Sequence, residues 1–139
     1  MPNMVIPNEA KLKWLSRMIS PAGHEDLILG LYQNNYTPVD GSSFLDFAPS
    51  TFAGYNEIAI VAADWSLPVI IANVGYLALP VAPAFTSTDV GGHLAYGWYL
   101  REDTSDTIMA AQRFAAARNM INGQTETLNP FRLALKTFI

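Results

Sequence analysis

The sequence predicts a mainly β domain, of β-sandwich or jelly-roll-like type, that carries one short N-terminal α-helix. Several short apolar stretches alternate in the manner of strands and are separated by turn residues. Helical spacing with capping residues occurs only at about residues 8–20. With 139 residues the chain has the length of one domain, so residues 1–139 are expected to form a single unit, with the β part at about residues 26–139.

The N-terminal helix is expected to begin at Asn8, which favours a helix cap, with Glu9 in its first turn. Apolar residues at helical spacing form its inner face: Leu12, Leu15, Met18 and Ile19. Pro21 and Gly23 end the helix near Ser20. Because so short a helix is marginal alone, it is expected to lie on a sheet or on a neighbouring subunit.

The first strand is expected at residues 27–32, where leucines alternate along the chain until two asparagines favour a turn. Phe44, Leu45 and Phe47 are expected to anchor the connection that follows, at residues 42–50. Three further strands are expected at residues 55–62, 69–72 and 76–79. A strand that is apolar on both faces is expected to be buried on both.

The clearest strand covers residues 94–101, and the short polar connection at residues 102–106 predicts a hairpin. The return segment, residues 108–120, is open between two interpretations, because the hairpin favours a strand and the alanines favour a helix. Apolar side chains of one strand face alternate with the rest: Leu94, Tyr96, Trp98 and Leu100. We expect the hairpin and the last strand to bury these residues together: Tyr96, Trp98, Phe114, Phe131 and Leu133.

The last part of the chain carries a strong turn signal. Asn122 and Gly123 predict a type I′ turn, which needs positive φ at both residues. The final strand is expected at residues 131–136, with Pro130 at its start or at a sheet edge.

The composition excludes several classes of function. The chain has 8 basic and 12 acidic residues and a net charge of −4, with the basic residues scattered, so we expect no nucleic-acid binding. Only 14% of residues are charged, against about a quarter in an ordinary domain, so much of the surface is expected to be neutral or covered. The absence of cysteine excludes a disulfide framework and a Cys-based zinc site.

No membrane segment is expected. The N-terminus has no basic region followed by an apolar run, so it does not predict a signal peptide. The most apolar stretch, residues 67–85, is interrupted by Pro68, Pro80 and Pro83, which do not suit a spanning helix.

The sequence offers no catalytic constellation, so we expect no enzyme activity, no metal and no cofactor. His24 and His93 lie in no recognisable signature. The adjacent carboxylates Glu25 with Asp26, and Glu102 with Asp103, have the oxygen ligands that a hard cation prefers. We interpret them as solvated loop residues.

Aromatic residues at positions 96, 98 and 99 raise the alternative of a carbohydrate-binding module, which would use them as a stacking platform. Such a platform needs exposed rings. Tyr96 and Trp98 share the apolar face of the predicted strand, so we interpret them as core residues.

The order of motifs resembles a family of small virion proteins encoded by tailed bacteriophages. The motifs that carry this resemblance are VIPNE at residues 5–9, LGLYQNNYTP at 29–38, DF at 46–47, TFAGY at 51–55, Trp65, AYGWYL at 95–100, RF at 113–114, NG at 122–123 and LNP at 128–130. They extend over nearly the whole chain. The chain departs from the family at residues 67–85, which are more apolar than the resemblance implies.

The resemblance implies a non-enzymatic protein of the virion, and the role we expect is capsid decoration, also called cement. The implied partners are the major capsid protein and further copies of the chain, as a trimer, on the capsid surface of particles assembled in the host cytoplasm. The alternative within the same class is a component of the tail, neck or fibre.

The apolar stretch at residues 67–85 is too long to be hidden wholly in the core of so small a domain, so part of it is expected to meet another protein. The expected interface residues are Trp14, Leu67, Val69, Ile71, Tyr76, Leu79 and Val81.

Overall fold

The computed structural model describes residues 4–19, 26–61, 64, 69–71, 74–79, 81–128 and 132–134. It contains one helix, α1 (Asn8–Ile19), and a 3₁₀ turn, η1 (Phe44–Asp46). The strands are β1 (Leu27–Tyr32), β2 (Ile58–Ile60), β3 (Val69–Ile71), β4 (Val74–Ala78), β5 (Ala84–Thr86), β6 (Leu94–Glu102), β7 (Ile108–Asn119), β8 (Thr125–Thr127) and β9 (Arg132–Ala134). The predicted class is confirmed: the described chain is mainly β with one short N-terminal helix.

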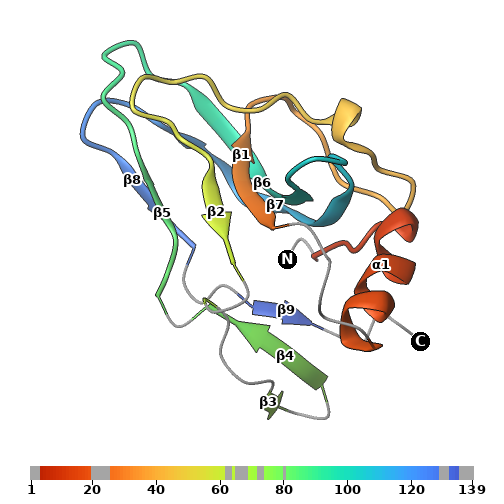
Figure 1. Cartoon of the computed structure of the whole chain (residues 1–139). Coiled ribbons are helices and arrows are strands. Elements are labelled where there is room, and N and C mark those ends of the chain that lie inside the picture. Colours follow the sequence, from red (N-terminus) through yellow and green to blue (C-terminus); the bar gives the residue numbers. More distant parts are fainter. Residues whose placement is uncertain are drawn as a thin grey trace.

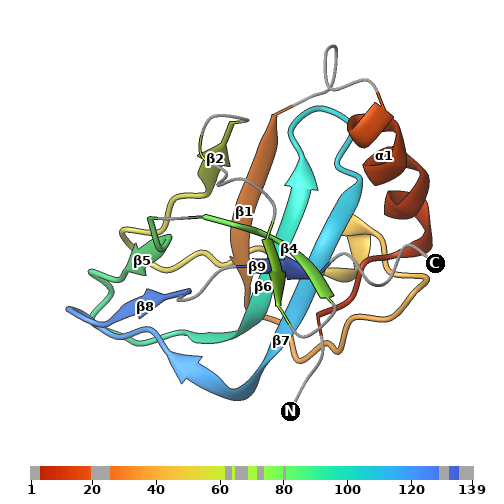
Figure 2. The same ribbon diagram turned by 90° about the horizontal axis from the view of Figure 1, so that it is seen from below.

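The described strands form three antiparallel sheets. The largest has the order β2-β1-β6-β7, the second has the order β3-β4-β9, and β5 pairs with β8 in a two-stranded ribbon. The second sheet lies beneath the first in Figure 1, and the view from below shows β4 and β9 crossing β6 and β7 (Figure 2). The arrangement is sandwich-like, with α1 packed along β7.

The hairpin of β6 and β7 is the centre of the large sheet, as predicted. The open question about residues 108–120 is decided in favour of a strand, since β7 pairs with β6 at residues 108–113 and again at residues 118–119. Pairing and burial therefore override the helix preference of the alanines. Two strands were missed, β5 and β8, because each is only 3 residues long and carries no clear alternation.

β-Bulges change which side chains of the hairpin share a face. Ala95 lies opposite Arg118 and Gly97 lies opposite Arg113, so residues 114–117 of β7 lie opposite Tyr96 alone. After this irregularity Trp98 packs on the same side as Ala95, while Tyr96 packs on the other side. The prediction that Tyr96 is buried with Trp98 is wrong, because strict alternation fails at a bulge.

The rest of the predicted core is tested only in part. Phe114 packs against the cluster that contains Trp98, as expected. Phe131 lies outside the described residues, and only the backbone of Leu133 is described, in β9.

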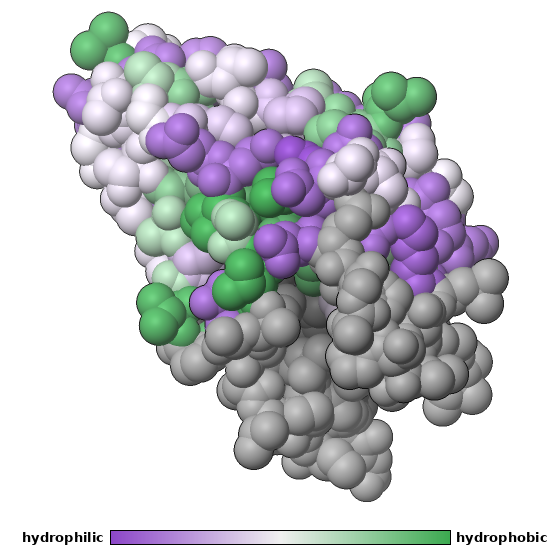
Figure 3. All heavy atoms as spheres, viewed as in Figure 1, coloured by the Kyte–Doolittle hydropathy of each residue, from purple (hydrophilic) through white to green (hydrophobic). Residues whose placement is uncertain are grey.

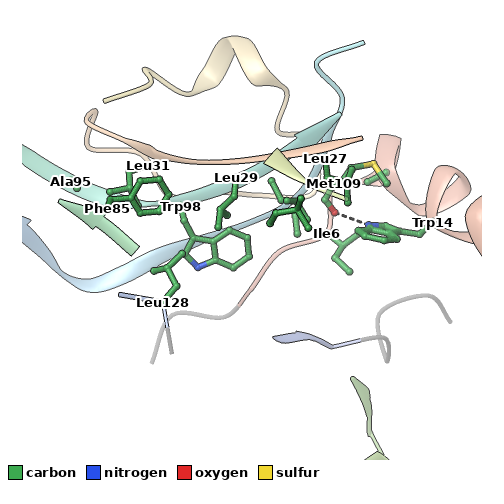
Figure 4. Close-up of a cluster of buried hydrophobic side chains, with 14 of the residues drawn as sticks. Ile6, Trp14, Leu27, Leu29, Leu31, Phe85, Ala95, Trp98, Met109 and Leu128 are labelled. Carbon is green, nitrogen blue, oxygen red and sulfur yellow. Dashed lines mark hydrogen bonds between the residues drawn. The ribbon is translucent and has the colours of Figure 1, made fainter. Parts of the chain in front are cut away.

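Two core clusters cover the two faces of the large sheet. The first, which we call the leucine core, lies on the side of β4 and β9 (Figure 4). Its members include Ile6, Ala10, Trp14, Leu27, Leu29, Leu31, Trp98, Leu100 and Met109. The second, the aromatic core, contains Tyr32, Phe47, Tyr99, Ile108 and Ala111, with Tyr36, Phe44 and Tyr96 packed against it.

Reciprocal glycine–tyrosine pairs join β1 to β6 within the aromatic core. Gly30 lies opposite Tyr99, and Tyr32 lies opposite Gly97. A Cβ at Gly97 would lie 2.5 Å from Tyr32 Oη, and one at Gly30 would lie 2.7 Å from Tyr55 Oη. Because glycine has no Cβ, the rings of Tyr99 and Tyr32 can pack directly over the backbone of Gly30 and Gly97.

The turn at Asn122 and Gly123 differs from the predicted type. Gln124 N–H donates to Ile121 O at 2.8 Å, which closes a turn with residues 122 and 123 at its centre. Gly123 has φ of +87°, whereas Asn122 is not among the described residues with positive φ. A positive φ at the third turn position alone fits a type II turn, so the type I′ prediction is wrong.

Candidate functional site

Candidate interaction surfaces are marked by large apolar side chains that the described structure leaves exposed. Leu45 is 96% exposed, Val81 and Val90 are each 83% exposed, and Leu94 and Ile121 are close to half exposed. These residues lie in three separate places. Leu45 lies in η1, and Val81 lies beside β2. Val90, Leu94 and Ile121 lie near the end of the β6–β7 hairpin that is far from its connecting loop.

Leu45 stands on a turn that is held from both sides. Ser43 N–H donates to Asp46 Oδ2 at 2.9 Å, and Phe47 N–H donates to Phe44 O at 3.1 Å. From the far side Asn34 Nδ2 donates to Asp46 O at 2.9 Å. The backbone of η1 is therefore fixed by hydrogen bonds that do not involve the side chain of Leu45.

The residues on either side of Leu45 point into the aromatic core. Phe47 is buried, and its ring centroid lies 5.0 Å from that of Tyr32. Phe44 lies 5.5 Å from Tyr99, and the guanidinium of Arg101 lies 5.1 Å from the centroid of Phe44. Because a 3₁₀ turn repeats every three residues, Phe44 and Phe47 face inward together and Leu45 faces outward. The expectation that Leu45 anchors this connection is wrong.

A groove of about 280 Å³ lies beside Leu45. Its lining comes from η1, the first turn of α1 and the β6–β7 loop: Glu9, Ser43, Phe44, Leu45, Ser105, Asp106 and Thr107. Glu9 Oε1 accepts a hydrogen bond from Ile108 N–H at 3.0 Å, and Asp106 pairs with Arg101 at 2.9 Å. The groove thus presents acidic and hydroxyl groups next to apolar ones. We call this groove and Leu45 the Leu45 surface.

Arg101 of β6 connects the Leu45 surface to the large sheet. Its Nη2 lies 2.8 Å from Glu57 Oε1, and Glu57 also accepts a hydrogen bond from the hydroxyl of Tyr99. Burial, together with the neighbouring Tyr55 hydroxyl, raises the pKa of Tyr99 far above its usual value. Tyr99 therefore stays neutral and donates to the Glu57 carboxylate.

A second hollow, of about 380 Å³, lies beside the edge strand β2 and is mostly apolar. It is lined by Ile58, Ala59, Ile60, Asp64, Leu79, Val81, Ala82 and Pro83. Figure 3 shows apolar side chains gathered around it. We call it the β2 groove.

The third group of exposed apolar side chains lies at the end of the β6–β7 hairpin where residues 87–93 lie next to residues 119–124. His93 and Met120 exchange backbone hydrogen bonds of 3.2 and 2.6 Å, and Met120 is fully buried. Leu94 and Ile121 directly follow His93 and Met120 in the chain, and their side chains are 47% and 44% exposed. Val90 lies in the turn that precedes them. We call Val90, Leu94 and Ile121 the tip.

Two pairs of polar side chains lie near the tip. Asp89 Oδ2 lies 3.0 Å from His93 Nε2, and Arg118 Nε lies 3.4 Å from Glu126 Oε1. Hydrogen bonds from the N–H groups of Gly91 and Ala53 lower the pKa of Asp89, and His93 adds to the effect. The three tip residues are apolar, and the Asp89 carboxylate lies next to Val90 in the chain.

The expected interface residues fall in different environments. Trp14 is buried in the leucine core, and its Nε1 donates to Met109 O at 2.8 Å (Figure 4). The prediction for Trp14 is wrong, because it lies four residues from Ala10 on the helix face that covers β7. Val81 is exposed at the β2 groove, whereas Leu79 is half-buried against the core. Leu67 lies outside the described residues, and Val69, Ile71 and Tyr76 lie on β3 and β4 without described side chains.

One of the acidic residues interpreted as solvated is buried. Glu102 is 3% exposed and pairs with Lys13 of α1, and Ser105 Oγ donates to it at 2.8 Å. The interpretation fails for Glu102 because it ends β6 beneath the helix and does not belong to the loop. Asp26 and Asp103 are exposed, and Glu25 and His24 lie outside the described residues.

The aromatic side chains that a carbohydrate-binding module would use for stacking are mostly buried. Trp98 and Tyr99 are buried on opposite faces of the sheet, so they do not form one platform. Tyr96 is half-buried, with the Arg113 guanidinium 5.4 Å from its ring centroid.

The described residues contain no group of three or more His, Cys, Asp or Glu side chains placed to hold a metal ion. No helix in the described part of the chain is long and apolar enough to cross a membrane. No protein-family model, no curated protein and no solved structure matches the chain.

Sequence reasoning missed the exposed positions Leu45, Val90 and Ile121. For Leu45 a signal was present: Phe44 and Phe47 have the three-residue spacing of a 3₁₀ turn, which leaves the two residues between them outside. For Val90 and Ile121 the local pattern gives no comparable sign.

Proposed function

We propose that the chain is a non-enzymatic structural protein of a tailed-bacteriophage virion, and that it decorates the capsid by binding the assembled major-capsid lattice. The motif order that resembles small virion proteins motivates this class. The observation that carries the proposal is the pair of unlike surfaces on one small β domain: the Leu45 surface, which carries the exposed Glu9 carboxylate, and the apolar tip. A lattice-bound protein that also self-associates needs two such surfaces.

The Leu45 surface is the better candidate for contact with the shell. A leucine held on a fixed turn loses little conformational freedom when it enters an apolar pocket of a partner. Glu9 is an exposed carboxylate in the adjoining groove, and it favours a partner that offers lysine or arginine there. The shell surface we propose is therefore an apolar pocket with basic residues at its rim.

Binding to the assembled shell, and not to separate capsid subunits, stabilises the particle by mass action. Particles from a phage that lacks the gene should assemble and package DNA, yet release it at a lower temperature or under milder osmotic shock. Adding the purified chain should restore the wild-type release temperature. Intact but tailless particles would instead support the alternative, a neck or tail component.

The carbohydrate-binding alternative has less support. Its aromatic platform would need Trp98 and Tyr99 at the surface, and both are buried.

A further inference from the structure

We infer that residues 114–117 of β7 form a strand-addition site. At this site an extended segment of a partner protein pairs with the edge of the large sheet and places an acidic side chain beside Arg113. The inference does not depend on the proposed function, and the site is separate from the Leu45 surface and from the tip.

The first argument is that this stretch of β7 lacks a full strand partner. Within the described part of the chain, β7 is the outermost strand of the large sheet (Figure 2). On its inner side the register with β6 passes from Arg113 to Arg118, so the four residues between them lie opposite Tyr96 alone. β6 therefore cannot pair with all of their backbone N–H and C=O groups. Such groups along an extended edge are a template for a further strand.

The second argument is access. Residues 115–117 are exposed alanines, whose side chains are too small to cover the backbone. Natural sheet edges are often protected by lysine, proline or an inward-pointing charge, and residues 114–117 contain none of these. The stretch is also held in place before a partner binds, because β6 pairs with β7 on either side of it. Association therefore orders little additional chain.

The N-terminal segment of the chain already adds to the same edge. Val5 N–H donates to Ala111 O at 2.7 Å, and Ala111 N–H donates to Val5 O at 2.8 Å. Because Ala111 also lies opposite Tyr99 of β6, Val5 pairs on the outer side of β7. The outer side of β7 is therefore able to exchange antiparallel hydrogen bonds with an added strand. Residues 114–117 lie further along this edge.

Charge selects an acidic segment as the occupant. The Arg113 guanidinium lies 5.4 Å from the ring centroid of Tyr96, and Arg113 forms no ion pair with any described residue. Arg118, at the other end of the stretch, already lies 3.4 Å from Glu126. Arg113 therefore favours a carboxylate on the added strand. A second copy suits the edge less well, because antiparallel pairing of residues 114–117 with themselves places Arg113 opposite Arg118.

Hydrogen exchange with synthetic peptides tests the inference. Without peptide, the amides of residues 115–117 should exchange about tenfold or more faster than those of β1, which pairs on both sides. A peptide of alternating valine and glutamate should slow this exchange, and the matched valine–lysine peptide should bind about tenfold or more weakly. No slowing at residues 115–117, or equal binding of the two peptides, would overturn the inference. Slowing that grows with protein concentration alone would assign the edge to a second copy and would also overturn it.

Blocked backbone groups separate strand addition from simple charge attraction. The valine–glutamate peptide with methylated backbone nitrogens should lose the effect, because it cannot donate to β7. Donors alternate in direction along a strand, so Ala115→Pro or Ala116→Pro should also abolish binding, while Ala116→Ser should retain it. Full binding of the methylated peptide, or of both proline variants, would contradict strand addition. The melting temperature of each variant shows whether it is folded.

The role of Arg113 has its own test. Arg113→Gln should bind the glutamate and lysine peptides with equal affinity, because the charge that distinguishes them is gone. A preference for the glutamate peptide that persists in this variant would overturn the assignment of Arg113. Binding to capsid shells is measured separately, so failure here leaves the decoration function standing.

Discussion

Single glycines decide whether β1 and β6 can pair as they do. Gly97→Ala places a Cβ against both Gln112 O and Tyr32 Oη, so we expect a loss of about 1 to 3 kcal/mol in the free energy of unfolding. Gly41→Ala is the control, since a Cβ there meets nothing within 4 Å and should change stability by about 0.5 kcal/mol or less. Denaturant unfolding of the two variants measures both values; equal stabilities would contradict the packing of Tyr32 on Gly97.

Tyr32 makes stability depend on alkaline pH. Burial raises its pKa from 10.0 to about 12 in the folded chain, and its hydroxyl donates to Tyr36 O at 3.0 Å. Its contribution is complete below pH 10.0, where the unfolded chain is also neutral, and is lost as the pH rises toward about 12. The loss amounts to about 2 to 3 kcal/mol. Denaturant titrations across this range should show a weaker pH dependence for Tyr32→Phe, and an unchanged slope would contradict the assignment.

At the scale of elements, α1 depends on one tryptophan for its docking. Trp14→Ala removes a buried ring and the hydrogen bond to Met109 O, and should cost about 3 to 5 kcal/mol. Lys11→Ala on the same helix should change stability by about 0.5 kcal/mol or less, because the hydrogen bond from Lys11 to Asn8 is exposed at the surface. Thermal unfolding followed by circular dichroism compares the two. If Trp14→Ala melted with Lys11→Ala, the helix would not be packed as described.

Helices and strands with a clear pattern in their own sequence could be predicted. The way in which these elements pack against one another could not. The caps and spacing of α1 and the alternation of β6 are local properties, and both elements were predicted at nearly their observed bounds. The faces of the hairpin depend on bulges at residues 95–97 and 100–101, which are set by pairing with β7 and leave no mark in the sequence of β6. Glu102 and Trp14 were misjudged for the same reason, because their burial depends on where α1 lies.

The candidate surfaces were harder to predict than the fold. The apolar stretch at residues 67–85 predicts an interface at Val81, and Val81 is exposed. Residues 94 and 121 come near each other only through the pairing of His93 with Met120, which no local pattern predicts. Leu45 looks like a core residue until the 3₁₀ turn of η1 is known.

At the scale of the whole molecule, we propose that the Leu45 surface makes the contact with the capsid shell. Leu45→Asp should weaken binding to shells that lack the chain by about tenfold or more, while Leu45→Met should retain it. Because Glu9 favours a basic rim on the shell, wild-type binding should also weaken as salt is raised. Co-sedimentation measures both effects. Unchanged binding of Leu45→Asp would move the contact to another surface, with the β2 groove as the next candidate.

The central claim, that the chain decorates a phage capsid, is tested most directly by a cryo-EM map of the particle that contains it. We expect density for this domain on the outer shell, repeated with the lattice, with Leu45 facing the major capsid protein. Density confined to the neck or tail, or a shell without this domain, would contradict it.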